Sequence, residues 1–202
     1  SESEIRSWRE SLPYMATVLD GAPEDAGVAI EYKVPQTANR IDFILSGYDD
    51  AGIPVAVVVE LKQWSDVGIT RKDAIVEANM RGGRTEMLHP SYQAWSYTQL
   101  LKDFNESIYE DGIKLVPCAY LHNCKDGTAL RSKHYETHVG NAPLFIRQDV
   151  SDLTAFINKH VRKGDRCKVL YEIENGKIRP SKELASHLDS LLQGNSEFTL
   201  ID

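Results

Sequence analysis

Runs of apolar residues between turn signals predict three consecutive strands in the first third of the chain. Segment 54–62, PVAVVVELK, is almost wholly aliphatic until it ends in an acid and a base. Segments 28–35 and 40–48 precede it, and the connections QTAN and DDAG suit tight turns. We therefore predict an antiparallel meander of three strands. Because the run VAVVV lacks polar alternation, both faces of the third strand should be covered.

Helical and strand patterns alternate along the rest of the chain. Apolar residues recur at helical spacing over 3–19, where Pro13 should kink or divide the helix. Residues 65–90 are polar and irregular, with a hairpin expected around 81–84. Further helices are predicted over 91–110 and 150–164, and further strands over 115–123 and 143–147. This order predicts an α/β fold in which helices flank a central mixed sheet.

Composition narrows the class of protein. The 202 residues suit a single domain over 1–202, with a core at about 3–150 and a C-terminal extension of helix and strand at 151–202. No apolar run approaches the roughly 20 residues that a membrane-spanning helix needs, so we expect no membrane association. Three cysteines without metal-ligand spacing favour a reducing cytoplasm. The net charge of −7 argues against a wholesale electrostatic grip on nucleic acid.

The polar end of the apolar strand raises two alternatives. Glu60 and Lys62 share one face, about 6.6 Å apart along the strand, and form either a surface ion pair or a site. Asp42 lies on the preceding strand, where a lone buried carboxylate is costly unless it is paired or bound to metal. Asp42, Glu60 and the backbone carbonyl of Leu61 are oxygen donors suited to Mg²⁺ or Mn²⁺. Lys62 beside them would stabilise charge that develops at a phosphate.

These residues carry a resemblance to a known family. Asp42 followed by Glu60-Leu61-Lys62 resembles the PD-(D/E)XK nuclease superfamily, with Ile41 where that motif has proline. Gln93 and Tyr97 resemble the Q-x-x-x-Y signature of its RecB-like branch, and their i, i+4 spacing puts both on one helix face. The resemblance implies a restriction-endonuclease-like core and a catalytic set of Asp42, Glu60, Lys62, Gln93 and Tyr97.

Longer stretches, IEYKVPQTANRIDF, VVVELKQW and HPSYQAWSYTQLLKDFN, resemble the N-terminal nuclease-like region of uncharacterised bacterial P-loop helicase-like proteins. There the nuclease-like domain precedes an ATPase. This chain has no G-x-x-x-x-G-K-[ST] motif, and we expect it to be a nuclease domain excised from a larger nuclease–helicase protein. The resemblance implies DNA and a C-terminal P-loop ATPase or helicase domain as partners, in phage defence or DNA repair.

Other residues are weaker candidates. The superfamily often takes a further metal-site acid from its first helix, which suggests Glu4, with Glu10 as its rival. His89 lies at the start of the Gln93 helix, where it would approach a phosphate, or else has no role. Trp64 is expected to pack rather than stack on a base. A local phosphate-binding rim, alternatively a solvated loop, comprises Arg71, Lys72, Arg81 and Arg84.

Two functions of different classes remain open from the sequence. The first is a Mg²⁺- or Mn²⁺-dependent deoxyribonuclease that works with a helicase domain. The second is a domain of the same fold that binds nucleic acid or a partner protein without cutting. An RNase with the same site is a third, remote option. The complete set of Asp, Glu, Lys, Gln and Tyr favours the first.

Overall fold

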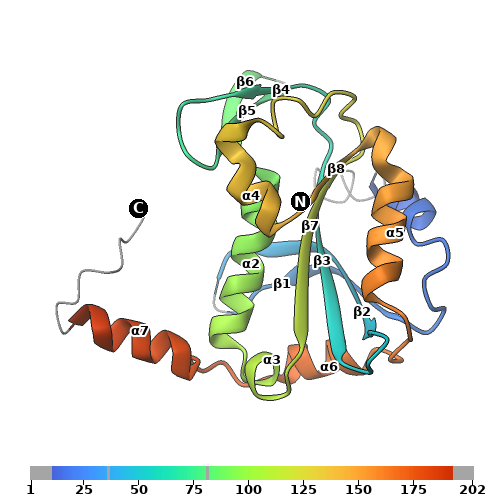
Figure 1. Ribbon diagram of the computed structural model, residues 1–202, viewed down its shortest axis with the longest axis vertical. Helices are drawn as coiled ribbons and strands as arrows, with labels where there is room; N and C mark the ends of the chain where they lie inside the picture. The colour runs from blue at the N-terminus through green and yellow to red at the C-terminus, as the bar shows by residue number, and fades with distance from the viewer. Residues whose placement is uncertain (1–10, 36, 81, 193–202) are drawn as a thin grey trace.

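The main sheet has five strands in the order β1-β2-β3-β7-β8 (Figure 1). The computed structural model describes residues 11–35, 37–80 and 82–192. Strands β1 to β3 are antiparallel neighbours, which confirms the predicted meander, and β7 and β8 continue the sheet in parallel with β3. The five strands are β1 (Gly27–Lys33), β2 (Arg40–Tyr48), β3 (Pro54–Lys62), β7 (Lys114–Leu121) and β8 (Leu144–Ile146).

A second, three-stranded antiparallel sheet lies beyond one end of the main sheet, at the top of Figure 1. It consists of β4 (Val67–Ile69), β5 (Ile75–Met80) and β6 (Gly83–Leu88). The predicted hairpin is the β5–β6 connection, but the sheet as a whole was not expected. The reason is physical: β4 has only three residues, and β6 buries no side chain, so neither shows an alternating pattern.

Helices cover both faces of the main sheet. Residues 11–18 are helical, and the rest of the predicted first helix lies outside the described residues, apart from residue 19, which is in a turn. In Figure 1, α2 and α4 lie on one side of the sheet and α5 on the other. The remaining elements are short 3-10 turns and the helices α2 (Pro90–Phe104), α3 (Glu106–Glu110), α4 (Glu136–Asn141), α5 (Val150–His160), α6 (Lys168–Asn175) and α7 (Lys182–Leu192).

Two predicted helices end earlier than expected. The expected single helix over 91–110 is broken at Asn105, whose backbone is extended and whose side-chain amide donates to the Ile173 carbonyl at 2.7 Å. Helix α5 stops at His160 instead of Gly164, because the N–H groups of residues 162 and 163 both donate to the Tyr48 carbonyl. In both cases a contact with a distant segment ends the helix.

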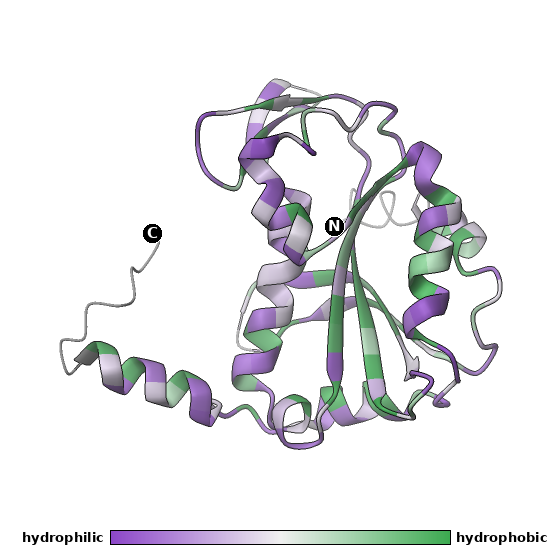
Figure 2. Cartoon of the chain, viewed as in Figure 1, coloured by the Kyte–Doolittle hydropathy of each residue, from purple (hydrophilic) through white to green (hydrophobic). Residues whose placement is uncertain are grey.

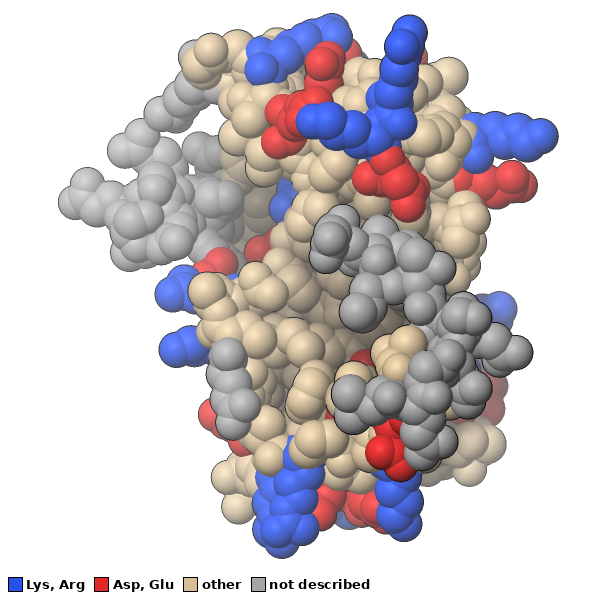
Figure 3. All heavy atoms as spheres, turned by 90° about the vertical axis from the view of Figure 1, so that its left-hand side faces the viewer, with Lys and Arg blue, Asp and Glu red and all other residues tan. Residues whose placement is uncertain are grey.

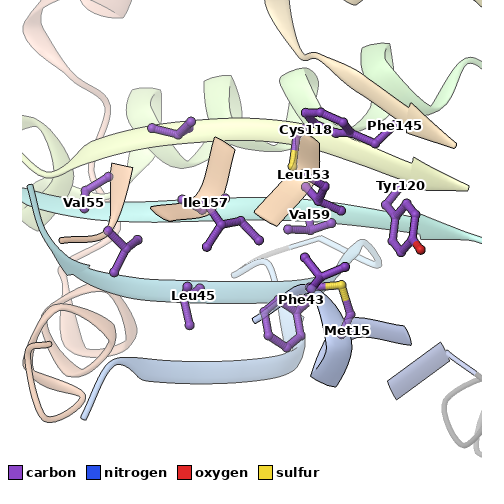
Figure 4. Close-up of a cluster of buried hydrophobic side chains, with 14 residues drawn as sticks. Met15, Phe43, Leu45, Val55, Val59, Cys118, Tyr120, Phe145, Leu153 and Ile157 are labelled. Carbon is purple, nitrogen blue, oxygen red and sulfur yellow. The ribbon is translucent and has the colours of Figure 1, made fainter. Parts of the chain in front are cut away.

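The core lies on both faces of β3, as its apolar run predicted. Figure 4 shows the cluster on the face that α5 covers. Val55, Val57 and Val59 pack with α5 on one face, whereas Ala56 and Val58 pack with α2 and α6 on the other. Figure 2 shows hydrophobic colouring along much of β3 and β7. Because α5 and α6 supply part of this core, it continues past residue 150, where we had placed the start of an extension.

The last helix, α7, projects away from the sheet in Figure 1. It joins the body through the backbone N–H of Ser181, which donates to the Asp103 carbonyl at 2.7 Å. Leu188 on this helix is 50% exposed. Across the part of the chain that the structure describes, no helix is long and apolar enough to cross a membrane.

Candidate metal and catalytic site

The ends of β2 and β3 bring two carboxylates together on one face of the sheet. Phe43 pairs with Val59 in the antiparallel register, so the next position puts Asp42 opposite Glu60. Asp42 Oδ2 accepts a hydrogen bond from the Leu61 backbone N–H at 2.8 Å. Residues directly opposite on neighbouring antiparallel strands share a face, with Cβ atoms about 5 Å apart. The register alone therefore makes the two acids neighbours.

Lys62 completes this group from the same face of β3. Its Nζ donates to Glu60 Oε1 at 2.6 Å. The side chain of Glu60 is only 2% exposed and that of Lys62 only 16% exposed. This burial excludes the surface ion pair that the sequence left open. The group is an interior one, and taking its charges out of water is costly.

The pKa values of the three side chains reflect this environment. Burial raises the pKa of Glu60 to about 8, although Lys62 opposes the rise and Asp42 adds to it. Burial also raises the pKa of Asp42. Burial lowers the pKa of Lys62, but Glu60, with smaller contributions from Asp42 and Tyr97, more than offsets this, so the pKa of Lys62 is raised. Two buried carboxylates beside one ammonium favour a further proton or cation between them.

The donor set fits a hard divalent cation. Glu60 Oε2 is buried and has no hydrogen-bond partner among the described residues, which is unusual for a buried carboxylate oxygen. Mg²⁺ and Mn²⁺ prefer oxygen ligands, and Mg²⁺ keeps several waters when one or two carboxylates hold it. Among the described residues, no group of three or more His, Cys, Asp and Glu side chains is arranged to hold a metal ion. The candidates Glu4 and Glu10 lie outside the described residues.

Helix α2 places Gln93 and Tyr97 beside the carboxylates. The Gln93 side-chain amide donates to the Tyr97 hydroxyl at 2.8 Å. Burial raises the pKa of Tyr97, and the charge of Glu60 adds to the rise, so the phenol keeps its proton. Because the hydroxyl oxygen already accepts from Gln93, its proton remains available for donation. The structure thus brings together all five side chains of the predicted catalytic set; their catalytic roles stay predictions.

One neighbouring acid was missed from the sequence. Ile30 pairs with Phe43 and Tyr32 with Ile41, so Glu31 lies opposite Asp42. Glu31 has a left-handed backbone with φ of 53°, a costly conformation for this residue type inside a strand. Its carboxylate contributes to the raised pKa of Asp42 and accepts from Arg40 at 2.7 Å. The alternating pattern of β1 identifies Glu31 as a neighbour of Asp42 only when the pairing register of β1 and β2 is also known.

The predicted phosphate-binding rim lies on and beside the small sheet. Lys72 pairs with Glu86 at 2.6 Å, and Arg84 pairs with Asp66 at 3.2 Å and with Glu77 at 3.5 Å. Figure 3 shows Lys and Arg side chains standing among Asp and Glu side chains at this end of the molecule. Arg71 is exposed and forms no ion pair with a described residue, whereas Arg81 lies outside the described residues. Among the described rim residues, positive and negative charges are therefore close to balanced.

Two aromatic candidates are interior residues. Trp64 is 6% exposed and packs in a hydrophobic cluster, with Lys62 Nζ 5.4 Å from its ring centroid. His89 is fully buried: its Nδ1 accepts from the Ser91 N–H at 3.2 Å, and its Nε2 contacts the Leu130 carbonyl at 3.0 Å. A buried ring with both nitrogens engaged has no access to a phosphate. We therefore do not keep His89 among the nucleic-acid contacts.

This arrangement can bind a cation through carboxylates and present an ammonium and a phenol to a ligand on that cation. Such a group is suited to reactions in which negative charge develops on oxygen. All three cysteines are free, so no disulfide shapes the site. Comparisons with protein-family models, with curated proteins and with solved structures found no match.

Proposed function

We propose that the chain is a Mg²⁺- or Mn²⁺-dependent nuclease that hydrolyses DNA phosphodiester bonds. The observation that carries the proposal is the buried group at the ends of β2 and β3. There Asp42 and Glu60 lie opposite each other, and Lys62 contacts Glu60 at 2.6 Å. A strongly perturbed carboxylate beside a specific charge partner is a functional-site candidate on physical grounds.

Each residue has a distinct role in this proposal. Asp42, Glu60 and the Leu61 carbonyl would hold the cation, which supplies a water of lowered pKa and neutralises phosphate charge. Lys62 orients the attacking oxygen and stabilises the negative charge that develops at phosphorus. Tyr97, oriented by the Gln93 amide, donates its hydroxyl proton toward a phosphate oxygen. All of these groups are in place before substrate arrives, which is how electrostatic stabilisation is most effective.

The fold supports the same proposal. A mixed sheet that contains an antiparallel meander and is flanked by helices agrees with the architecture predicted from the sequence. The acids lie at the ends of the central strands, and the helix that carries Gln93 and Tyr97 follows β6 and precedes β7. The resemblance and the geometry thus point to the same five side chains.

The electrostatics of the small sheet bear on how substrate is held. Of the three described rim cations, Lys72 and Arg84 are paired to acids, so the described rim offers few free phosphate contacts. Affinity for DNA depends strongly on the number of phosphates neutralised. We therefore propose weak intrinsic binding, with the strand delivered by a P-loop ATPase or helicase domain.

The direct test is a cleavage assay with labelled linear DNA, circular DNA and RNA of the same sequence, in Mg²⁺, in Mn²⁺ and in EDTA. The proposal predicts cleavage of DNA that requires the metal and is abolished by EDTA. Cleavage of RNA alone would move the substrate to the other nucleic acid. Metal-independent cleavage, or binding without cleavage under all conditions, would contradict the proposal and favour the non-cutting alternative.

A further inference from the structure

We infer that His89 is a positioning residue, which sets the start of α2 and thereby places Gln93 and Tyr97 over the carboxylates. The inference rests on the proposed function and deepens it, because it names a residue outside the cluster on which the reaction depends. His89 is the N-cap of α2, and Pro90 occupies the first helical position. It is fully buried, although histidine is a rare choice for a helix cap.

The contacts of the His89 ring fix its chemical form. The Ser91 backbone N–H can only donate, so Nδ1 must accept at 3.2 Å. The Leu130 backbone carbonyl can only accept, so Nε2 must carry the proton and donate at 3.0 Å. Both contacts are made at once only by the neutral ring with its proton on Nε2. The ring is therefore a rigid bridge between the first turn of α2 and the segment around Leu130.

Two further contacts join His89 to the small sheet. Its backbone N–H donates to the Ala74 carbonyl at 2.7 Å. Ala74 has a φ of 54°, a strained value that persists only where the surroundings hold it. The His89 ring also packs against Tyr135, whose hydroxyl donates to the Ile75 carbonyl at 2.6 Å. The start of α2 is thus tied to β5 on one side and to the segment around Leu130 on the other.

These contacts act on the catalytic face of α2 through its first turn. The His89 carbonyl accepts from the Gln93 N–H at 3.0 Å, which is the first hydrogen bond of the helix. Further along, Ala94, Thr98 and Leu101 are buried. A frayed first turn would therefore displace Gln93 first and deprive Tyr97 of its hydrogen-bond donor, while the rest of α2 stays packed. A displacement of about 1 Å at a reacting group is enough to cost about a hundredfold in rate.

Two substitutions of His89 distinguish the effect of its capping hydrogen bond from the effect of its ring volume. His89→Ala removes both contacts, whereas His89→Asn keeps an acceptor near Nδ1 and is a favourable N-cap. Ile157→Val is the stability control, because Ile157 is a buried residue of α5, on the opposite face of the sheet from α2. Cleavage of labelled DNA, Mn²⁺ affinity by calorimetry, melting temperature and amide hydrogen exchange are measured for all three variants and the wild type.

We expect His89→Ala to lower kcat by roughly tenfold or more with KM nearly unchanged, since positioning and not substrate affinity is lost. His89→Asn should recover kcat to within about threefold of wild type, and Ile157→Val should retain it despite its lower melting temperature. Mn²⁺ affinity should be the same in all four proteins, because the carboxylates lie on β2 and β3. Amide hydrogen exchange at Ser91 and Gln93 should be faster in His89→Ala than in the other three proteins.

Equal kcat in His89→Ala and wild type would overturn the inference, as would parallel losses in His89→Ala and His89→Asn. Exchange at Ser91 and Gln93 that is unchanged in His89→Ala would show that His89 does not cap α2, and would also overturn it. Absence of cleavage by the wild-type protein would overturn the proposed function and the catalytic claim for His89 with it. The exchange measurement needs no activity, so the two failures are distinguishable.

Discussion

Two lysine–glutamate pairs in this molecule have the same nitrogen–oxygen distance and opposite surroundings. Lys62 contacts Glu60 at 2.6 Å, and Lys72 contacts Glu86 at 2.6 Å. The side chains of the first pair are 16% and 2% exposed, whereas those of the second are 64% and 49% exposed. The first lies where two strands of the main sheet end, and the second lies on the small sheet. Distance alone does not distinguish them.

The difference in burial between the two pairs indicates which of them is the better candidate for a functional site. An exposed pair contributes about 0 to 1 kcal/mol to stability. A buried pair carries a desolvation cost of several kcal/mol per ion, and its pKa values move accordingly. Glu60 shows this directly, because burial raises its pKa to about 8. The buried pair is the one with an unusual chemical state, and each prediction below contrasts a buried group with an exposed counterpart.

The largest expected effect is on catalysis. Lys62→Ala should lower kcat by about a hundredfold or more, because the ammonium acts on charge that develops during reaction. Lys72→Ala, which breaks the exposed pair, should leave kcat within about twofold of wild type. Cleavage of labelled DNA with both variants measures the contrast. Similar rates for the two variants would place the observed activity at another site.

The second effect is on stability as a function of pH in the metal-free protein. Folding raises the pKa of Glu60. The stability that Glu60 contributes is therefore fully present below its pKa in the unfolded chain and is lost as pH rises through its pKa in the folded protein. A rise from about pH 5 to about pH 8 should therefore lower the free energy of unfolding by about 3 kcal/mol through Glu60. Glu60→Gln should remove the part of this slope that Glu60 contributes and leave the part that the raised pKa of Asp42 contributes, whereas Glu86→Gln should leave the slope as it is. Denaturant unfolding at several pH values measures both; parallel curves for wild type and Glu60→Gln would refute the assignment.

Buried His89 and exposed His134 offer a second contrast of this kind. Here the expected change in stability is smaller, and stability falls as pH falls rather than as pH rises. Burial lowers the pKa of His89 to about 4, so its proton uptake is easier in the unfolded state. Stability should therefore fall by about 2 kcal/mol as pH falls from about 6.5 to about 5. His89→Asn should remove this loss, whereas replacement of the exposed His134 should not. Thermal melts across this pH range measure this loss. If His89→Asn loses as much stability toward low pH as the wild type does, the result would count against a neutral buried ring.

The smallest effect concerns the rim. Arg71 forms no ion pair with a described residue, so it is free to contact a phosphate, whereas Lys72 is held by Glu86. Arg71→Ala should reduce the slope of log affinity against log salt by about 0.9, and Lys72→Ala should change it less. Fluorescence anisotropy with labelled DNA over a salt series measures the slopes. A steep slope that neither variant reduces would indicate a basic surface elsewhere.

Much of the fold and the main candidates were predictable from the sequence. The run VAVVV gave the covered central strand, and the short turns gave the meander, because both signals are local. The small sheet was not predictable as a sheet, since β6 buries no side chain. The break at Asn105 depends on the Ile173 carbonyl, which is 68 residues away. Long-range contacts of this kind leave no local pattern.

The candidate site divides in the same way. Glu60 and Lys62 were singled out by an abrupt change of polarity in an apolar strand, and Asp42 by its place on the preceding strand. Glu31 was missed because its relation to Asp42 depends on the register of β1 and β2. His89 was placed near a phosphate, whereas it is buried, because the sequence does not show that the Leu130 carbonyl meets its ring.

The most direct test of the central claim is to locate bound Mn²⁺ by anomalous diffraction from crystals soaked in its chloride. We predict one strong anomalous peak between the carboxylates of Asp42 and Glu60, with metal–oxygen distances of about 2.1 Å. The peak should be absent in crystals of Asp42→Asn grown and soaked in the same way. Manganese bound only elsewhere, or no peak at this position in the wild-type protein, would contradict the account.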